Sequence, residues 1–211
     1  MTTDTPLKKA RDLSKAQSRA RLIDAAATSI HRHGLRGATI GEIQAISNLS
    51  RGMINLHFKS KENLLLAVAE HLANAYDAHM EQAINAAGSD PKAQLLALFR
   101  ADLDPNILNS RDVSIWFSFR AEGHTNPQFQ TCIGTRSGHF ARLLKGICKA
   151  LTPIPHHPVN APALAASALV SLLEGIWTDF HLNPDNFNRE EALQTCLYVA
   201  DRLFADQLQG Q

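Results

Sequence analysis

Apolar residues recur three and four positions apart along most of the chain, which is the pattern of amphipathic helices. Leu22, Ile23, Ala26, Ala27 and Ile30 form the first such series. No segment sustains the alternation of apolar and polar residues that is typical of a half-buried strand. The pattern therefore predicts an all-α fold of about nine helices without an internal repeat.

Helix-capping and helix-breaking residues set the expected boundaries. Gly34 should end the first helix at about His33, because glycine readily adopts the left-handed conformation found at helix ends. After two short helices, an unbroken helix should run from Ser60 to about Ala87, a length of about 40 Å at 1.5 Å per residue. Further helices are expected at about 91–103, 111–122, 127–150, 160–181 and 188–208.

Residues 39–58, TIGEIQAISNLSRGMINLHF, have the spacing of a helix-turn-helix motif. Thr39 is followed three residues later by a glutamate, which is a capping-box spacing at the start of a helix. Asn48 tolerates the left-handed turn, and Ile43 and Ile54 provide apolar contacts between the two helices. A motif of this kind places its second helix in the major groove of DNA.

The second helix of the motif presents polar and basic residues outward. Arg51 and Asn55 can read base edges, because arginine pairs with guanine and asparagine with adenine. Thr39, Lys59 and Lys61 are expected at phosphates, which position a protein without specifying sequence. The full set of expected DNA-binding residues is Thr39, Ser50, Arg51, Gly52, Met53, Asn55, Leu56, His57, Lys59 and Lys61.

The charge distribution favours a polyanion-binding head. Residues 1–61 contain 11 Lys/Arg and 4 Asp/Glu, a net charge of +7, whereas the remaining 150 residues contain 10 and 16, a net charge of −6. A basic N-terminal third on an acidic body is typical of a nucleic-acid-binding domain. We therefore expect a flexible basic arm at 1–13, a DNA-binding domain at 14–60 and a second domain at 61–211.

Residues from about Ala16 to Tyr76 resemble the TetR family of transcriptional regulators. The markers are Arg21-Leu-Ile-Asp-Ala-Ala, Gly34, Ala38-Thr39-Ile40, Ile43, Leu49-Ser50-Arg51-Gly52, His57-Phe58 and Lys61-Glu62-x-Leu64-Leu65. Three positions depart from the family pattern: Gln44 replaces an alanine, Asn48 a turn glycine and Asn55 a tyrosine. The resemblance implies a repressor that a small-molecule effector releases from a palindromic DNA operator.

The C-terminal body resembles the choline-responsive BetI subgroup of that family. Trp116-Phe-Ser-Phe119 and Leu173-Glu-Gly-Ile-Trp177 carry this resemblance. It implies a ligand pocket beyond the head for choline or a related quaternary amine, a kind of cation that aromatic faces attract. Ordinary core packing is the alternative role for these rings. The expected ligand-binding residues are Trp116, Phe119, Glu122, Glu174, Trp177 and Phe180.

The resemblance also implies that the last two helices pair two subunits in a four-helix bundle. Small and aliphatic residues along these helices suit such a contact, with intrachain core packing as the alternative. The expected dimerisation residues are Ala168, Gly175, Leu193, Leu197, Ala200 and Phe204. The unbroken helix at 60–87 would connect the head with the pocket.

Other kinds of chemistry find little support in the sequence. Three cysteines without CxxC spacing favour neither a disulfide framework nor a zinc site. The pairs His31-x-His33 and His156-His157 lack further ligands at metal-binding spacing. No catalytic motif is present, so we expect neither an enzyme nor a bound cofactor. The most apolar run, 161–173, is shorter than the roughly 18–20 residues of a membrane span, so we expect a cytoplasmic protein that does not enter the membrane.

Two other interpretations remain open. A helical protein-interaction module with a vestigial head would share the fold without binding DNA, and the salt dependence of binding to duplex DNA distinguishes it. A regulator of drug efflux would share both the fold and the DNA binding, but would take a hydrophobic ligand.

Overall fold

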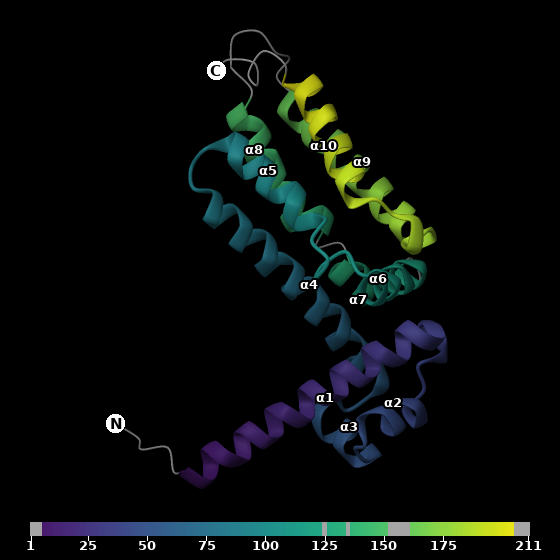
Figure 1. The fold of residues 1–211 in the computed structure, drawn as a ribbon. Helices are drawn as coiled ribbons and strands as arrows, with labels where there is room; N and C mark the ends of the chain where they lie inside the picture. The colour runs from purple at the N-terminus through teal and green to yellow at the C-terminus, as the bar shows by residue number, and fades with distance from the viewer. Residues whose placement is uncertain (1–5, 124–125, 134–135, 152–160, 205–211) are drawn as a thin grey trace. The chain divides into compact units, whose positions relative to one another are not determined.

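The computed structural model describes residues 6–123, 126–133, 136–151 and 161–204, and within these ranges the chain forms helices and no strands (Figure 1). This confirms the predicted all-α class. A π-helical turn, Arg136–Phe140, precedes α8, and a 3₁₀ turn, Pro184–Asn186, precedes α10. The α-helices are α1 Pro6–Gly37, α2 Ile40–Ser47, α3 Arg51–Phe58, α4 Lys61–Ala87, α5 Pro91–Asp102, α6 Ser110–Gly123, α7 Pro127–Ile133, α8 Ala141–Leu151, α9 Ala161–Leu182 and α10 Arg189–Leu203.

The chain divides into two compact units. The first unit contains residues 1–72 and 114–132, and the second contains residues 73–113 and 133–211. This division differs from the predicted boundary at 60–61. The first turns of α4 stay with the head because Leu64 and Val68 are fully buried there, and most of α6 belongs to the same unit.

The first unit is organised around α1. Gly34 has a φ of 69° and a ψ of 174°, so the helical backbone is interrupted there, as the sequence predicts. The two short helices α2 and α3 pack against α1. Helix α6 also contacts α1. Glu122 of α6 accepts a hydrogen bond from Arg36 Nε at 2.8 Å, and Ser114 Oγ of α6 lies 2.7 Å from His31 Nδ1. These contacts fasten α6 to the C-terminal part of α1.

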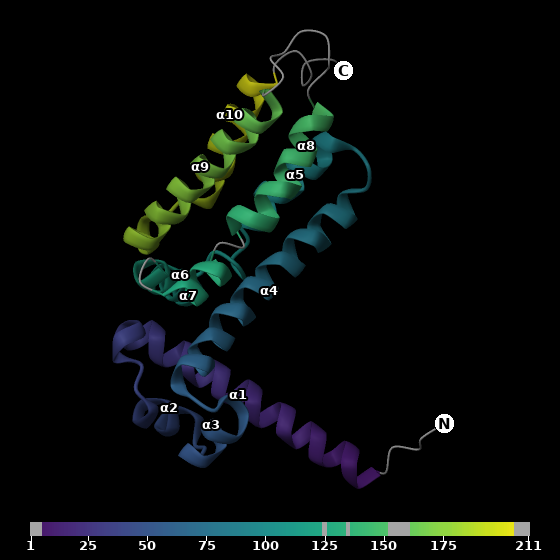
Figure 2. The same cartoon turned by 180° about the vertical axis from the view of Figure 1, so that it is seen from behind.

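The N-terminal segment is helical where a loose arm was predicted. Residues 6–13 are the first turns of α1, and residues 1–5 lie outside the described ranges. The reason is local, because Pro6 suits the first position of a helix and neither glycine nor proline occurs again before Gly34. In Figures 1 and 2 this part of α1 extends past α3 with no other helix of its unit beside it.

The second unit is a bundle in which α5, α8, α9 and α10 lie side by side (Figure 2). Two helices of this unit begin with a capping side chain. Asp90 accepts hydrogen bonds from the backbone N–H groups of the first turn of α5, and Asn188 does the same for α10. The fully buried side chains of Phe99, Leu144 and Leu169 form part of the core.

The prediction of one helix over 127–150 was wrong. The structure has three helical elements there: α7, the π-helical turn and α8. Gly138 lies within the π-helical turn, and glycine weakens a regular helix by about 1 kcal/mol relative to alanine. This division also explains why the described residues hold one α-helix more than the sequence predicts. The last helix was expected to reach about residue 208, and residues 205–208 lie outside the described ranges.

One helix, α9, is long and apolar enough to cross a membrane by length and composition alone, with 22 residues and a mean hydropathy of 1.3 over its most apolar window. The core helix of a folded bundle meets the same criterion. Here α9 packs against α8 and α10 and buries Leu169, Leu173 and Trp177 among other side chains. We therefore interpret α9 as a core helix of the second unit.

Candidate DNA-binding surface and effector site

The helix-turn-helix motif forms as the sequence predicts. Thr39 Oγ1 accepts a hydrogen bond from the backbone N–H of Glu42 at 3.2 Å and so caps α2. Asn48 closes α2 with a left-handed backbone, φ 52° and ψ 37°, and donates its N–H to the carbonyl of Gln44. Ile43 and Ile54 are fully buried between the two helices and α1. The turn therefore holds α3 at a fixed angle to α2.

The predicted reading face of α3 is exposed. Arg51, Gly52, Asn55 and Leu56 all face solvent, and Leu56 keeps 63 % of its surface accessible. Met53 is half-buried. A face that combines a guanidinium, a carboxamide and an apolar side chain can donate hydrogen bonds to base edges and contact a thymine methyl group.

Residues around the start of α4 provide the expected phosphate-binding groups. Ser60 Oγ accepts a hydrogen bond from the N–H of Asn63 at 3.1 Å and caps α4. Lys59 is exposed, and its φ of 67° turns the chain between α3 and α4. Lys61 is the first residue of α4, where the helix N-terminus favours anions. Ser50, another expected DNA-binding residue, occupies the N-cap position of α3, and its side chain makes no capping hydrogen bond.

His57 lies differently from the prediction of an outward-facing side chain. Its Nε2 atom is buried, and the ring packs beside Phe58 with the two ring centroids 6.1 Å apart. Burial lowers the pKa of His57, and the nearby charges of Lys15 and Arg19 lower it further. The imidazole Nε2 is therefore turned away from solvent, unlike Arg51 and Asn55 on the same helix.

The six expected ligand-binding residues fall into both units. In the first unit, Trp116 and Phe119 are buried, and Phe119 meets Phe129 edge-on at 5.1 Å. Glu122 forms an ion pair with Arg36 in that unit. Trp177, Phe180 and Glu174 belong to the second unit, so each group is described separately.

Trp177 is paired with a carboxylate that the sequence analysis missed. Asp102 is fully buried. It accepts a hydrogen bond from Trp177 Nε1 at 2.9 Å and another from the Tyr76 hydroxyl at 2.7 Å. The rings of Tyr76 and Trp177 meet edge-on at 6.0 Å, and Phe140 lies 6.0 Å from Tyr76 on another side. We call Tyr76, Asp102, Phe140 and Trp177 the Asp102 cluster.

The cluster gives Trp177 a buried carboxylate partner, Asp102, from another helix. A signal for Asp102 was present in the sequence, because it continues the spacing of Leu95, Leu98 and Phe99 on the apolar face of α5. No comparable signal identifies Tyr76 as its partner, since α4 and α5 meet only in the folded chain. Phe180 has another role: it meets Phe187 edge-on, and the Arg189 guanidinium lies 5.3 Å from its ring centroid.

The expected dimerisation residues differ in exposure. Ala168 and Gly175 are exposed, whereas Leu193 and Leu197 are half-buried. Ala200 and Phe204 are only 2 % and 5 % exposed, so most of their surface packs within the protomer.

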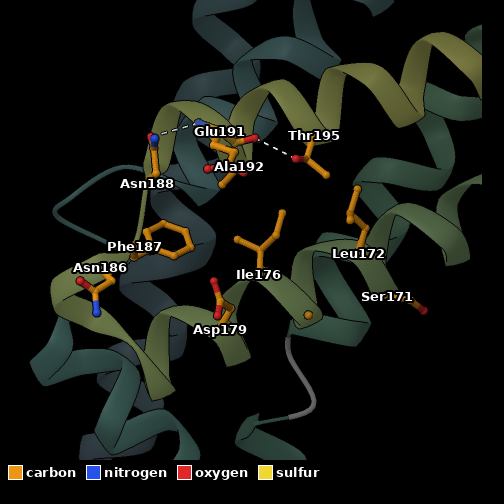
Figure 3. Close-up of a pocket in the computed structure, with 11 residues that line it drawn as sticks. Ser171, Leu172, Ile176, Asp179, Asn186, Phe187, Asn188, Glu191, Ala192 and Thr195 are labelled. Carbon is orange, nitrogen blue, oxygen red and sulfur yellow. Dashed lines mark hydrogen bonds between the residues drawn. The ribbon is translucent and has the colours of Figure 1, made fainter.

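A groove runs along the surface between α9 and α10 beside the exposed dimerisation positions. Its volume is about 510 Å³, and Gly175 is one of its lining residues. Figure 3 shows Leu172, Ile176 and Phe187 pointing toward the groove, with Asp179 and Glu191 at the same site. An added Cβ at Gly175 would meet no atom within 4 Å.

Histidines and cysteines in the described ranges form ordinary contacts. His33 Nε2 lies 3.3 Å from Glu42 Oε1, whereas His31 pairs with Ser114, so the two side chains do not converge. Within those ranges no group of three or more His, Cys, Asp or Glu could hold a metal ion, and His156 and His157 lie outside them. Burial raises the pKa of Cys148 and that of Cys196 to about 12, so both thiols stay protonated.

A helix-turn-helix whose second helix is exposed and whose flanks are basic defines a DNA-binding regulator. The comparisons with known proteins give the family. Residues 22–68 match the model of bacterial regulatory proteins of the tetR family, and residues 91–205 match the model of the BetI-type transcriptional repressor C-terminal domain. The chain belongs to the TetR family of transcriptional regulators and carries a BetI-type C-terminal domain.

Individual relatives agree with this assignment. The HTH-type transcriptional regulator BetI of Paraburkholderia xenovorans is 29 % identical over 89 % of this chain and 93 % of its own, and that of Yersinia pestis is 28 % identical over 83 % and 86 %. The crystal structure of a transcriptional regulator from Pseudomonas aeruginosa PAO1 has a TM-score of 0.82 at 27 % identity, covering 90 % of this chain and 91 % of that one. These relatives are named as regulators rather than as enzymes or interaction modules.

A further solved structure shares the fold. A transcriptional regulator from Saccharomonospora viridis, crystallised in complex with choline, has a TM-score of 0.75 at 17 % identity and covers 88 % of this chain and 96 % of that one.

Proposed function

We propose that the protein is a homodimeric repressor that binds a palindromic operator in the cytoplasm and leaves it when a small molecule binds. Repression, response to ligands and dimerisation are typical of the family. A dimer related by a two-fold axis would place its two α3 helices in successive major grooves, about one helical turn of DNA apart. The exposed face of α3 with Arg51 and Asn55 is the observation that carries this proposal.

Within this proposal, side chains of α3 read bases and those around it bind phosphates. Arg51 and Asn55 would make hydrogen bonds to base edges, and Leu56 would contact a thymine methyl group. The hydroxyl of Thr39 accepts one hydrogen bond as a cap and keeps its proton for a phosphate oxygen. Lys59 and Lys61 supply positive charge beside it.

Selection of bound duplexes from a random library by the full-length protein tests the DNA-binding part. The proposal predicts enrichment of a palindrome whose half-site centres are separated by about 10 base pairs or a multiple of that. Binding without enrichment of any sequence would contradict it.

We propose that α9 and α10 of two protomers form the dimer contact, with the groove of Figure 3 facing the partner subunit. The groove combines apolar side chains with an exposed glycine, which permits close approach of another helix. Ala168 and Leu197 lie on the same two helices and remain candidates for the contact.

We propose further that the effector is an organic cation such as choline, bound at the Asp102 cluster. A buried carboxylate surrounded by Tyr76, Trp177 and Phe140 offers the negative charge and the aromatic faces that attract a quaternary ammonium group. The names of the BetI relatives and the choline complex of the Saccharomonospora viridis regulator support this ligand class.

Binding of a cation at the Asp102 cluster would also explain how the protein responds to its effector. The hydrogen bonds of Asp102 join α4, α5 and α9, and a ligand that competes for the carboxylate would change how those helices pack. Because α4 belongs to both units, such a change would shift the balance between two states of the dimer, provided that the ligand binds one of them more tightly.

Calorimetry with choline, betaine aldehyde and the neutral isostere 3,3-dimethylbutan-1-ol tests the effector class. Trp177→Ala should raise the dissociation constant for choline at least tenfold, because a desolvated cation–π contact is worth about 2 kcal/mol. Trp116→Phe in the first unit should change it less than twofold. Equal binding of the neutral isostere, or no heat with any cation at millimolar concentration, would contradict the proposal and favour a hydrophobic effector of the kind that a drug-efflux regulator binds.

A further inference from the structure

The N-terminal part of α1 is a helix without an evident packing role in its own unit. It extends past α3 in both views (Figures 1 and 2). Residues 13–17 are all exposed, and Leu13 keeps 57 % of its surface accessible. An exposed helical stretch gains little from packing, so residues 13–17 are available for a role at the surface.

Basic residues mark one face of this helix. At 3.6 residues per turn, positions 15 and 19 of α1 lie on the same face, and they are occupied by a lysine and an arginine. The side chains of Lys15 and Arg19, one turn apart, are both exposed. We call Lys15 and Arg19 the α1 basic pair.

The α1 basic pair lies beside the recognition helix. The Arg19 guanidinium carbon is 5.2 Å from the centroid of the Phe58 ring, at the C-terminal end of α3. The charges of Lys15 and Arg19 also act on His57, the residue before it. The basic pair is therefore continuous with the proposed DNA-binding surface around Lys59 and Lys61.

We infer that the α1 basic pair is a second phosphate-binding element, which adds backbone contacts to the helix-turn-helix motif of the same protomer. The inference rests on the proposed function, because it assumes that α3 lies in the major groove. Phosphates are recognised by exposed Lys and Arg side chains, and stacking on Phe58 keeps the Arg19 guanidinium at the edge of α3. Such contacts strengthen binding to any duplex and leave sequence preference to α3.

Salt-dependent binding measures these contacts directly. The full-length protein is titrated, between 50 and 200 mM salt, into a duplex obtained by selection and into a random-sequence duplex of equal length. Each neutralised phosphate contributes about 0.9 to the slope of log affinity against log salt. The double variant Lys15→Gln/Arg19→Gln should flatten that slope by about two per protomer, or about four per dimer. It should also bind both duplexes more weakly, and the two fold-losses in affinity should agree within about twofold.

Matched variants separate charge from structure. Lys145→Gln/Lys149→Gln removes the same charge from exposed positions on α8 and should leave the slope unchanged. Arg19→Lys keeps the charge without the planar group and should retain most of the slope, whereas Lys15→Gln alone, which leaves the contact with Phe58 intact, should flatten it by about one per protomer. Thermal melting checks that each variant is folded.

The outcomes also distinguish this inference from the proposed function. If Lys15→Gln/Arg19→Gln keeps the wild-type slope, or weakens binding only to the selected duplex, the inference is overturned even when Arg51→Ala abolishes sequence preference. If the wild-type protein does not prefer the selected duplex, the proposed function fails, whatever the slope.

Discussion

The two units of the chain use polar side chains in opposite ways. In the first unit the important polar groups are at the surface: Thr39 caps α2, and Arg51 and Asn55 face solvent on α3. In the second unit the most distinctive polar group, Asp102, is fully buried and holds the side chains of two other helices. The contrast fits the proposed division of labour, in which the first unit would present the DNA-reading surface and the second would hold the buried contact that the effector changes.

The largest expected effect concerns the groove on the second unit. Gly175→Glu adds a charge where Asp179 and Glu191 already line the surface, so two protomers should no longer pair. Sedimentation at micromolar concentration should then give a monomer, and binding to the selected operator should be lost because one head makes half of the contacts.

Gly146→Glu is the matched control for this change. Gly146 is another exposed helical glycine with open space around its Cβ position, on α8. Both substitutions should leave the protomer folded, because glutamate is a better helix former than glycine. A dimeric Gly175→Glu variant would contradict the proposed contact between α9 and α10.

A smaller effect, on stability, is expected at Asp102. Asp102→Ala removes the acceptor of two buried donors, the Tyr76 hydroxyl and Trp177 Nε1. Each buried donor left unsatisfied costs about 1–3 kcal/mol, so the free energy of unfolding should fall by about 2–6 kcal/mol in urea denaturation. Asp102→Asn keeps one of the two accepting oxygens, so one donor stays paired and the loss should be about half of that. If Asp102→Ala were as stable as the wild type, the buried carboxylate would not join the three helices.

The smallest expected effect is in the turn of the first unit. Asn48 has a φ of 52°, a conformation that costs a residue with a Cβ about 1–2 kcal/mol, and one that Asn and Gly tolerate best. Asn48→Ala should therefore lower the free energy of unfolding by about 1 kcal/mol, whereas Asn48→Gly should change it by less than about 0.5 kcal/mol. A loss with glycine as large as that with alanine would mean that the asparagine side chain, rather than the backbone conformation, stabilises the turn.

The same contrast explains what could be predicted from the sequence. The helix-turn-helix depends on caps, a turn residue and apolar spacing within about 20 consecutive positions, so its elements and the exposure of Arg51 and Asn55 were predicted correctly, although the position of His57 was not. Asp102, Tyr76 and Trp177 come from three helices that are far apart in the chain, and no local pattern brings them together. Helical spacing places Glu174 and Trp177 on one face of a helix, but it does not identify the side chains that a different helix places opposite them.

Errors in the fold have equally local causes. The basic composition of residues 1–13 suggested a loose arm, although Pro6 and the lack of any later breaker before Gly34 allow α1 to start there. The exposed stretch that results carries Lys15, which the helix-turn-helix pattern alone does not include. The resemblance implied Ala200 and Phe204 as dimerisation residues, but their exposure depends on which side of α10 meets the rest of the bundle.

The central claim is that α3 reads base sequence. The most direct test compares the affinity of the wild-type protein for the selected operator duplex with that of Arg51→Ala and of Asn55→Ala. Fluorescence anisotropy at a fixed salt concentration should show each variant weaker by about 1–3 kcal/mol on that duplex, with unchanged affinity for a random-sequence duplex in the Asn55→Ala case, since Asn55 is uncharged. Wild-type affinity of both variants for the operator would contradict the assignment of α3 as the recognition helix.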